Sequence, residues 1–208
     1  MVTKVILKAY SLIFVTYTGA IILAVSLGSL GSRPLALNGL DDCHLPCWNA
    51  ITPQQTTLDH ASVSLFRSGY AIESVNHHWR YMTYQPPDPA ACKIALTYSR
   101  LVLVTELSEC GDVSLGDVMA ILGAPEGVLP SGLFDSFVFR NGTVVVNTRK
   151  YRCSTGFSLH AAIVSIRLRA QGDEPVQSRQ VSTLNPLPWR GFVSRGHYQQ
   201  LYPDAIGC

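Results

Sequence analysis

The apolar positions along this chain fall into three patterns, and the first is an uncharged run. It covers 23 positions, 9–31, between Lys8 and Arg33. A helix of that length spans roughly 34 Å, which is enough to cross the hydrocarbon core of a bilayer. We therefore expect residues 1–31 to anchor the chain in a membrane. Lys4 and Lys8 would stay inside, and the rest of the chain would lie outside the cytoplasm.

A cleaved secretory signal is the alternative for this segment. Ser26-Leu27-Gly28 or Ser29-Leu30-Gly31 would provide a weak cleavage site. The apolar run exceeds the stretch of about 7–15 residues that is usual for such signals, so the anchor is favoured. A third interpretation, a buried core helix, would require a large domain around it.

The second pattern is helical and occurs twice. Apolar residues at steps of i, i+3 and i+7 indicate one face of a helix. The positions are Leu58, Ala61 and Leu65 in the first segment, and Leu115, Val118 and Leu122 in the second. Ser114 with Asp117 predicts an acidic capping box at the second helix, and Thr56 with Asp59 offers the same arrangement at the first.

The third pattern is strand-like and follows each helix. The expected strand segments are 71–85, 93–105, 136–140, 143–148 and 161–169. Asn141-Gly142 lies between two apolar runs and is the strongest hairpin signal in the chain.

These patterns predict an α+β fold with an N-terminal transmembrane helix followed by two tandem helix-plus-antiparallel-sheet units. The first unit would cover 32–108 and the second 109–170. Residues 171–208 would form a Pro-rich loop and an aromatic C-terminal strap.

Charge argues against a nucleic-acid partner. After Gly31 the chain has 14 Lys and Arg (the 16 of the whole chain less Lys4 and Lys8) and 14 Asp and Glu, so its net charge is zero. A nucleic-acid-binding domain should be basic. The distribution is uneven, with net −6 over 32–139 and net +6 over 140–208. This indicates two separately solvated surfaces or, alternatively, docking between the halves or onto a partner or lipid surface.

Six cysteines predict disulfides in an exported protein: Cys43, Cys47, Cys92, Cys110, Cys153 and Cys208. Sequence cannot select one pairing. If the two units share equivalent bridges, Cys110 bonds Cys153. On the same logic Cys92 bonds one of the two N-terminal cysteines, and the other bonds Cys208. A local bridge between the two N-terminal cysteines is the rival.

Candidate chemistry beyond disulfides is sparse. Cys43-His44-x-x-Cys47 could hold zinc, but a fourth ligand at matching spacing is missing. His60, His77 and His78 are more typical of surface imidazoles than of ligands. The sequence contains no Gly-x-Ser-x-Gly, no His-Glu-x-x-His and no phosphate-binding glycine loop. We therefore expect no enzyme activity, no metal and no cofactor.

Aromatic residues provide the candidate binding surface. The candidates are His78, Trp79, Tyr81, Tyr84 and Trp189. On a strand, Trp79 and Tyr81 would share one face and His78 and Tyr84 the other, so one set could simply be core. Trp189 lies in the aromatic tail, where it either straps across the sheet or forms a recognition patch.

Short motifs resemble a family of envelope proteins. Leu122-Gly123-Ala124-Pro125, and Ile51-Thr52-Pro53 running to Leu65, are similar to motifs of the SmpA/OmlA (BamE) group and the related β-lactamase-inhibitor-protein fold. The segment Cys43–Trp48 also looks like a group of uncharacterised bacterial surface proteins. The resemblance covers about 120 residues. It implies tandem helix-plus-sheet units, binding or scaffolding as the usual work, and no catalytic residues.

The expected function is therefore non-catalytic binding or scaffolding at the cell membrane. The chain would be a single-pass protein, anchored through residues 9–31, with its C-terminal domain outside the cytoplasm and an unknown protein partner in the envelope. The alternatives are a secreted inhibitor or sensor module that grips an extracellular protein or ligand, and an enzyme with a Cys/His centre, which would need a free thiol.

Overall fold

The computed structural model describes residues 13–20, 23, 37, 39–40, 45–130, 134–149, 157–171 and 186–192. By its internal contacts the chain divides into two compact units, Met1–Arg33 and Pro34–Cys208. The second unit contains the sheet and both longer helices.

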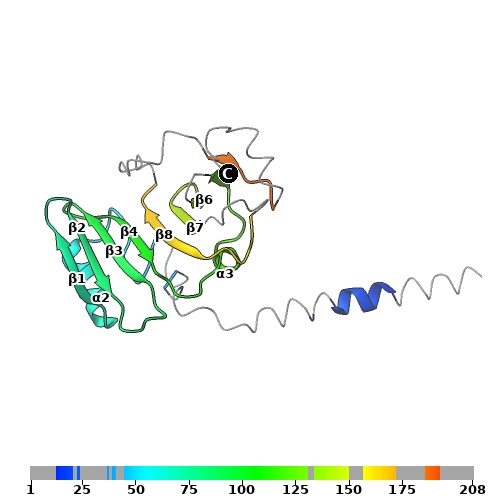
Figure 1. Cartoon of the computed structure of the whole chain (residues 1–208), viewed down its shortest axis with the longest axis horizontal. Helices are drawn as coiled ribbons and strands as arrows, with labels where there is room; N and C mark the ends of the chain where they lie inside the picture. The colour runs from blue at the N-terminus through cyan, green and yellow to red at the C-terminus, as the bar shows by residue number, and fades with distance from the viewer. Residues whose placement is uncertain are drawn as a thin grey trace, which may run out of the picture. The chain divides into compact units, whose positions relative to one another are not determined.

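One antiparallel sheet dominates the second unit, and two helices accompany it. The helices are α2 (Leu58–Arg67) and α3 (Leu115–Leu122). The strands are β1 (Ala71–Asn76), β2 (Tyr81–Gln85), β3 (Lys93–Tyr98), β4 (Val102–Ser108), β5 (Gly127–Pro130), β6 (Phe134–Phe139), β7 (Val144–Arg149), β8 (Ile163–Arg169) and β9 (Leu187–Pro188). Their spatial order is β1-β2-β3-β4-β8-β7-β6-β5-β9, and Figure 1 shows β4 beside β8. α2 therefore precedes a set of four strands, β1–β4, and α3 precedes a set of four, β5–β8, followed by the short strand β9. The last strands of the two four-stranded sets, β4 and β8, lie next to each other.

The expected fold class is wrong. We predicted an α+β fold with a transmembrane helix and two tandem helix-plus-sheet units, whereas the strands form a single nine-stranded sheet with few helices. The physical reason is the pairing of β4 with β8 through five residue pairs, from Val104 with Arg169 to Ser108 with Ser165. This pairing satisfies the backbone groups of both strands and leaves no boundary between two sheets.

The expected transmembrane helix is also corrected. Residues 13–20 are helical, and the other positions of 9–31 except residue 23 lie outside the described residues. Among the residues that are described, no helix is both long enough and apolar enough to cross a membrane.

Both helices of the second unit lie where the apolar spacing predicted them. Ser114 accepts a hydrogen bond from the backbone N–H of Asp117, and the Asp117 carboxylate accepts one from the backbone N–H of Ser114 at 2.9 Å, so the predicted capping box is confirmed. The cap of α2 is Thr57 rather than Thr56, because the Thr57 hydroxyl accepts from the His60 N–H. The Thr56 hydroxyl instead accepts from the backbone N–H of Thr52.

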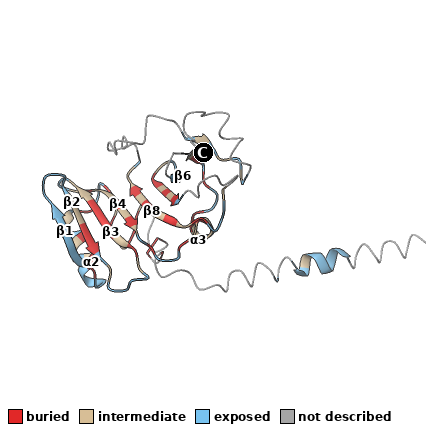
Figure 2. Ribbon diagram, in the orientation of Figure 1, coloured by how far each residue is buried: buried red, intermediate tan, exposed pale blue. Residues whose placement is uncertain are grey.

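A single core lies on one face of the sheet. Side chains alternate between faces along a strand, so every second residue of the central strands points into this core. Its fully buried members include Leu65 of α2, Leu96 of β3, Leu115 of α3, Phe137 of β6 and Ile166 of β8. Figure 2 shows the buried positions on β3, β8 and α3, whereas β1 is exposed along its whole length. Burial of apolar surface from both strand sets therefore joins them into one folding unit.

Two turns divide segments that we expected to be continuous. Residues 77–80 join β1 to β2, and residues 99–101 join β3 to β4. The predicted Asn141-Gly142 turn is confirmed between β6 and β7, where both residues have positive φ, 55° and 78°. The short strands β5 and β9 had no counterpart in the predicted pattern.

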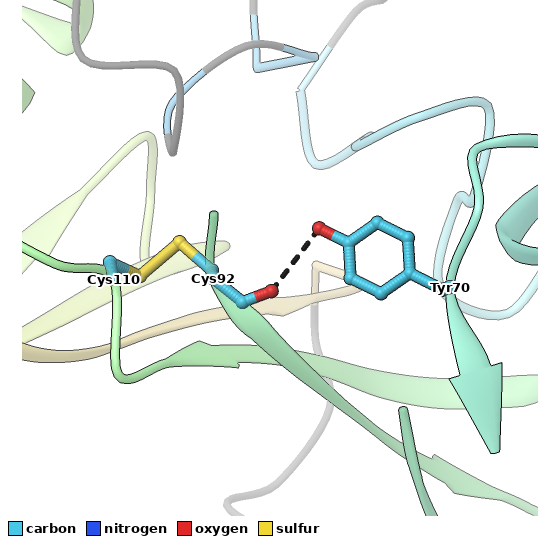
Figure 3. Close-up of a disulfide and its surroundings, with 3 residues drawn as sticks. All are labelled: Tyr70, Cys92 and Cys110. Carbon is cyan, nitrogen blue, oxygen red and sulfur yellow. Dashed lines mark hydrogen bonds between the residues drawn. A yellow bond between two sulfur atoms is a disulfide. The ribbon is translucent and has the colours of Figure 1, made fainter. Parts of the chain in front are cut away.

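A buried disulfide closes the open end of the β3–β4 hairpin. Cys92 lies directly before β3, Cys110 lies two residues after β4, and the two are bonded to each other. The Tyr70 hydroxyl donates to the Cys92 carbonyl at 3.1 Å, which ties the start of β1 to the same point (Figure 3). The pairings expected for Cys92 and for Cys110 with Cys153 are therefore wrong.

The other cysteines are only partly described. Cys47 is buried and also disulfide-bonded. Cys43, Cys153 and Cys208 lie outside the described residues.

The two edges of the sheet differ. In β1 the register shifts between Ile72 and Ser74, which leaves Glu73 in a bulge. At the other edge, β9 covers β5 through two residue pairs. A side chain on Gly127 would lie 2.8 Å from the Cβ of Pro186, so only glycine permits this close approach.

The capping box provides a first prediction. Ser114→Ala removes the acceptor of the Asp117 N–H and should lower the free energy of unfolding by about 1 kcal/mol. Ser114→Asn, which can accept the same hydrogen bond, should recover most of that loss. Urea unfolding of the three proteins measures both effects. Equal stability of the alanine variant and the parent would contradict the role of this cap.

The disulfide provides a second prediction. Replacing Cys92 and Cys110 together by alanine opens a loop closed over a sequence separation of 18 residues and should destabilise the fold by about 3 kcal/mol. Denaturant unfolding of the oxidised parent and the double variant measures the loss. A loss below about 1 kcal/mol would mean that strand pairing alone holds this end of the hairpin.

Candidate functional site

The candidate site is the face of the sheet opposite the core. We call it the outer face, and it consists of Tyr81, Thr83, Lys93, Ala95, Thr97, Val104, Glu106, Ser108, Ser136, Val138, Val145, Asn147, Ser165, Arg167 and Arg169. Side chains alternate between the two faces of a strand, so the register of the sheet assigns these residues to one side. The buried residues of α2 and α3 belong to the core on the other side.

A row of polar side chains crosses the outer face. Strand pairing places Lys93, Ser108, Ser165, Asn147 and Ser136 side by side on five successive strands. The Ser136 hydroxyl donates to the Asn147 side-chain oxygen at 2.6 Å, and the Asn147 amide donates to the Ser165 hydroxyl at 3.0 Å. Ser136 and Ser165 are buried, and their hydrogen bonds fix the orientation of the partly exposed Asn147 amide between them.

An ion pair occupies the next row. Glu106 of β4 lies directly opposite Arg167 of β8, with 3.1 Å between the Arg167 Nε and a Glu106 oxygen. Both side chains are partly exposed, so the pair contributes at most about 1 kcal/mol to stability. Its neighbours in the row are Ala95 and Val145, which surround the charges with apolar surface.

Tyr81, the first residue of β2, lies in a third row. It pairs with Thr97, and the row continues through Val104 to Arg169. Burial raises the pKa of the Tyr81 phenol, and the nearby Glu106 carboxylate raises it further. Arg169 donates from its Nε to the Gly142 carbonyl at 2.7 Å, which holds the β6–β7 turn against this side.

A second ion pair borders the outer face at the bulge. Lys93 donates to a Glu73 oxygen at 2.8 Å. This hydrogen bond lowers the pKa of the Glu73 carboxyl and raises the pKa of the Lys93 ammonium.

The sequence-predicted candidates separate in the structure. Tyr81 lies on the outer face, but Tyr84 is fully buried and shares a 2.7 Å hydrogen bond with Ser62 of α2. His78 and Trp79 lie in the β1–β2 turn, with ring centroids 4.9 Å apart. The five candidates therefore do not form one site, and Tyr84 belongs to the core.

Trp189 lies elsewhere, in the segment that follows β9. It is half-buried and contacts the rings of Phe137, Phe157 and Phe192. The Trp189 backbone N–H donates to the Glu126 backbone carbonyl at 3.0 Å. Trp189 therefore packs against other aromatic rings and is not part of the outer face.

The chemistry that this arrangement supports is recognition. Its members supply donors, acceptors, three cations and an aromatic ring at fixed spacings. Within the described part of the chain, no group of three His, Cys, Asp or Glu residues could hold a metal ion. Cys47, Cys92 and Cys110 are all in disulfides.

Sequence reasoning missed the central residues of the outer face. Glu106 and Ser108 alternate with buried residues along β4, and Ser165, Arg167 and Arg169 occupy every second position near the end of β8. This alternation of polar residues is the signal that could have assigned them to one face.

Comparisons with known proteins do not place the chain in a family. No protein-family model matches it, and no curated protein matches it. Among solved structures, the chain is similar to a DUF4309 family protein (YjgB) from Bacillus subtilis subsp. subtilis str. 168. The two share 14% sequence identity, with 60% of this chain and 84% of that chain covered and a TM-score of 0.42. At this level of similarity the comparison does not bear on function.

The Glu73–Lys93 pair predicts a defined pH dependence. Because the pKa of Glu73 is lowered in the folded state, its contribution to stability is present above the unfolded pKa and is lost as the pH falls through the folded pKa. Carboxyl NMR titration should give a lower midpoint for Glu73 in the parent than in Lys93→Gln. Arg167→Gln removes the same charge elsewhere on the outer face and should leave the Glu73 midpoint almost unchanged. Equal shifts in the two variants would refute a direct hydrogen bond.

Proposed function

We propose that this protein is a non-catalytic, extracytoplasmic binding or scaffolding protein that holds a protein partner on the outer face of its sheet. The observation that carries the proposal is the arrangement of the three rows around the Glu106–Arg167 pair. Tyrosine and arginine are enriched at the centres of protein interfaces, and Tyr81, Arg167 and Arg169 lie on this face.

Rigidity supports a role in binding. Ten of the fifteen outer-face residues are partly exposed, whereas Thr83, Ala95, Ser136, Val138 and Ser165 are buried. Asn147 is partly exposed and is held by hydrogen bonds to Ser136 and Ser165. A partner would therefore meet side chains whose conformations are already restricted. Such preorganisation lowers the entropy cost of association.

Disulfides support a location outside the cytoplasm. Cys92 and Cys110 are almost completely buried and bonded to each other, and Cys47 is also bonded. Disulfides of this kind persist in oxidising compartments and are rare in the cytosol. The uncharged N-terminal run and the motifs similar to the SmpA/OmlA group are consistent with export to an envelope.

Site-specific photo-cross-linking in the native envelope fraction tests the proposal. A benzoylphenylalanine at Thr97, on the outer face, should give a defined cross-linked partner. The same probe at Asp59, an exposed position of α2, is the control and should not give that product.

A charge swap makes the test specific. The double variant Glu106→Arg/Arg167→Glu keeps an ion pair between β4 and β8 and should keep the unfolding free energy within about 0.5 kcal/mol. It reverses the charges that a partner meets, so the Thr97 cross-link should fall about tenfold or more. An undiminished cross-link in the folded double variant, or an equal product from Asp59, would overturn the proposal.

A further inference from the structure

Two hairpin turns lie side by side at one end of the sheet, next to the row of the outer face that contains Tyr81 and Thr97. Residues 77–80 form the β1–β2 turn and residues 99–101 form the β3–β4 turn (Figure 1). The Tyr98 backbone N–H donates to the Arg80 carbonyl at 3.0 Å, which joins the two turns. We call residues 77–80 and 99–101 together the hairpin tips.

The hairpin tips carry cationic and aromatic side chains and no acidic ones. His77, His78, Arg80 and Arg100 are all exposed, and Trp79 is 69% exposed. In the described part of the chain, neither arginine has an ion-pair partner. The turns and loops at the opposite end of these strands carry the acidic residues Asp88, Glu109 and Asp112.

Trp79 is held in its exposed position by the turn. Its backbone N–H donates to the Asn76 side-chain oxygen at 3.0 Å, and its ring meets the His78 ring edge to face. Arg80 follows with φ 48°, which reverses the chain into β2. The turn therefore projects the indole beyond the end of the sheet rather than folding it onto the core.

We propose that the hairpin tips dock on an anionic phospholipid surface. The two arginines match the negative headgroups in charge, and each basic residue near such a surface strengthens binding about fivefold. An exposed tryptophan gains from the headgroup region, where its apolar ring and its N–H are both accommodated. A soluble polyanion would use the cations but gives no comparable reason for a projecting indole.

This inference goes beyond the proposed function, because it uses the end of the sheet and not the outer face. Glu106 lies within β4, five residues after the 99–101 turn, and Arg167 lies on the neighbouring strand β8, so neither residue belongs to the hairpin tips. The two proposals can therefore fail independently of each other.

Quenching by brominated lipids tests the docking. The full chain is added to vesicles of brominated phosphatidylcholine with or without brominated phosphatidylglycerol, so that any general insertion of the chain is quenched in both. The chain has three tryptophans, so the fluorescence of Trp79 is obtained as the difference between the parent protein and the Trp79→Phe variant. This emission should be quenched strongly only when phosphatidylglycerol is present, and added salt should reverse the effect.

A matched pair of variants locates the charge effect. Arg80→Gln/Arg100→Gln should weaken the phosphatidylglycerol-dependent quenching roughly 20-fold. Arg140→Gln/Arg149→Gln removes the same charge from another turn and from the exposed end of β7, and should retain most of the quenching. Both variants are compared after far-ultraviolet circular dichroism shows that they are folded.

Three results would overturn the proposal. The first is equal quenching of the Trp79 emission with and without phosphatidylglycerol. The second is an equal loss in both double variants, which would indicate a diffuse effect of net charge. The third is tight binding to dextran sulfate with no quenching by phosphatidylglycerol, which would assign the hairpin tips to a soluble polyanion.

Discussion

The pairing of β4 with β8 is the interaction on which the rest of the structure depends. On one face it sets Leu107 against Ile166 and joins the cores of the two strand sets. On the other face it sets Glu106 against Arg167 and creates the centre of the outer face. Without this pairing, each set of four strands would have a smaller core and an additional open edge.

Local signals predicted the helices and one turn, because their chemistry lies within a few residues. The Ser114 capping box and the Asn141-Gly142 turn are of this kind. The turns at 77–80 and 99–101 contain neither glycine nor proline, the two residues that interrupt a strand pattern most strongly. The predicted α+β class failed because the joining of β4 to β8 depends on a long-range pairing that composition and periodicity do not encode.

From the sequence, the alternation of side chains along one strand predicts which residues share a face, but it does not predict which residues of other strands lie beside them. Tyr81 and Tyr84 were expected on opposite faces, and they are. The partner of Glu106 comes from β8, far away in the sequence, and only the register identifies it. The disulfide was misassigned for a related reason: we assumed that the two units carry equivalent bridges, whereas Cys92 and Cys110 close a single hairpin.

The unequal edges of the sheet have a consequence for crowded conditions. At β1 the bulge at Glu73 interrupts the regular ladder and places a carboxylate there, and at β5 the short strand β9 ends in a proline that has no N–H to offer. Neither edge presents a long, flat template to another copy of the chain. Addition of a strand from another copy is therefore disfavoured at both edges of the described sheet, which lowers the tendency of crowded copies to form fibres.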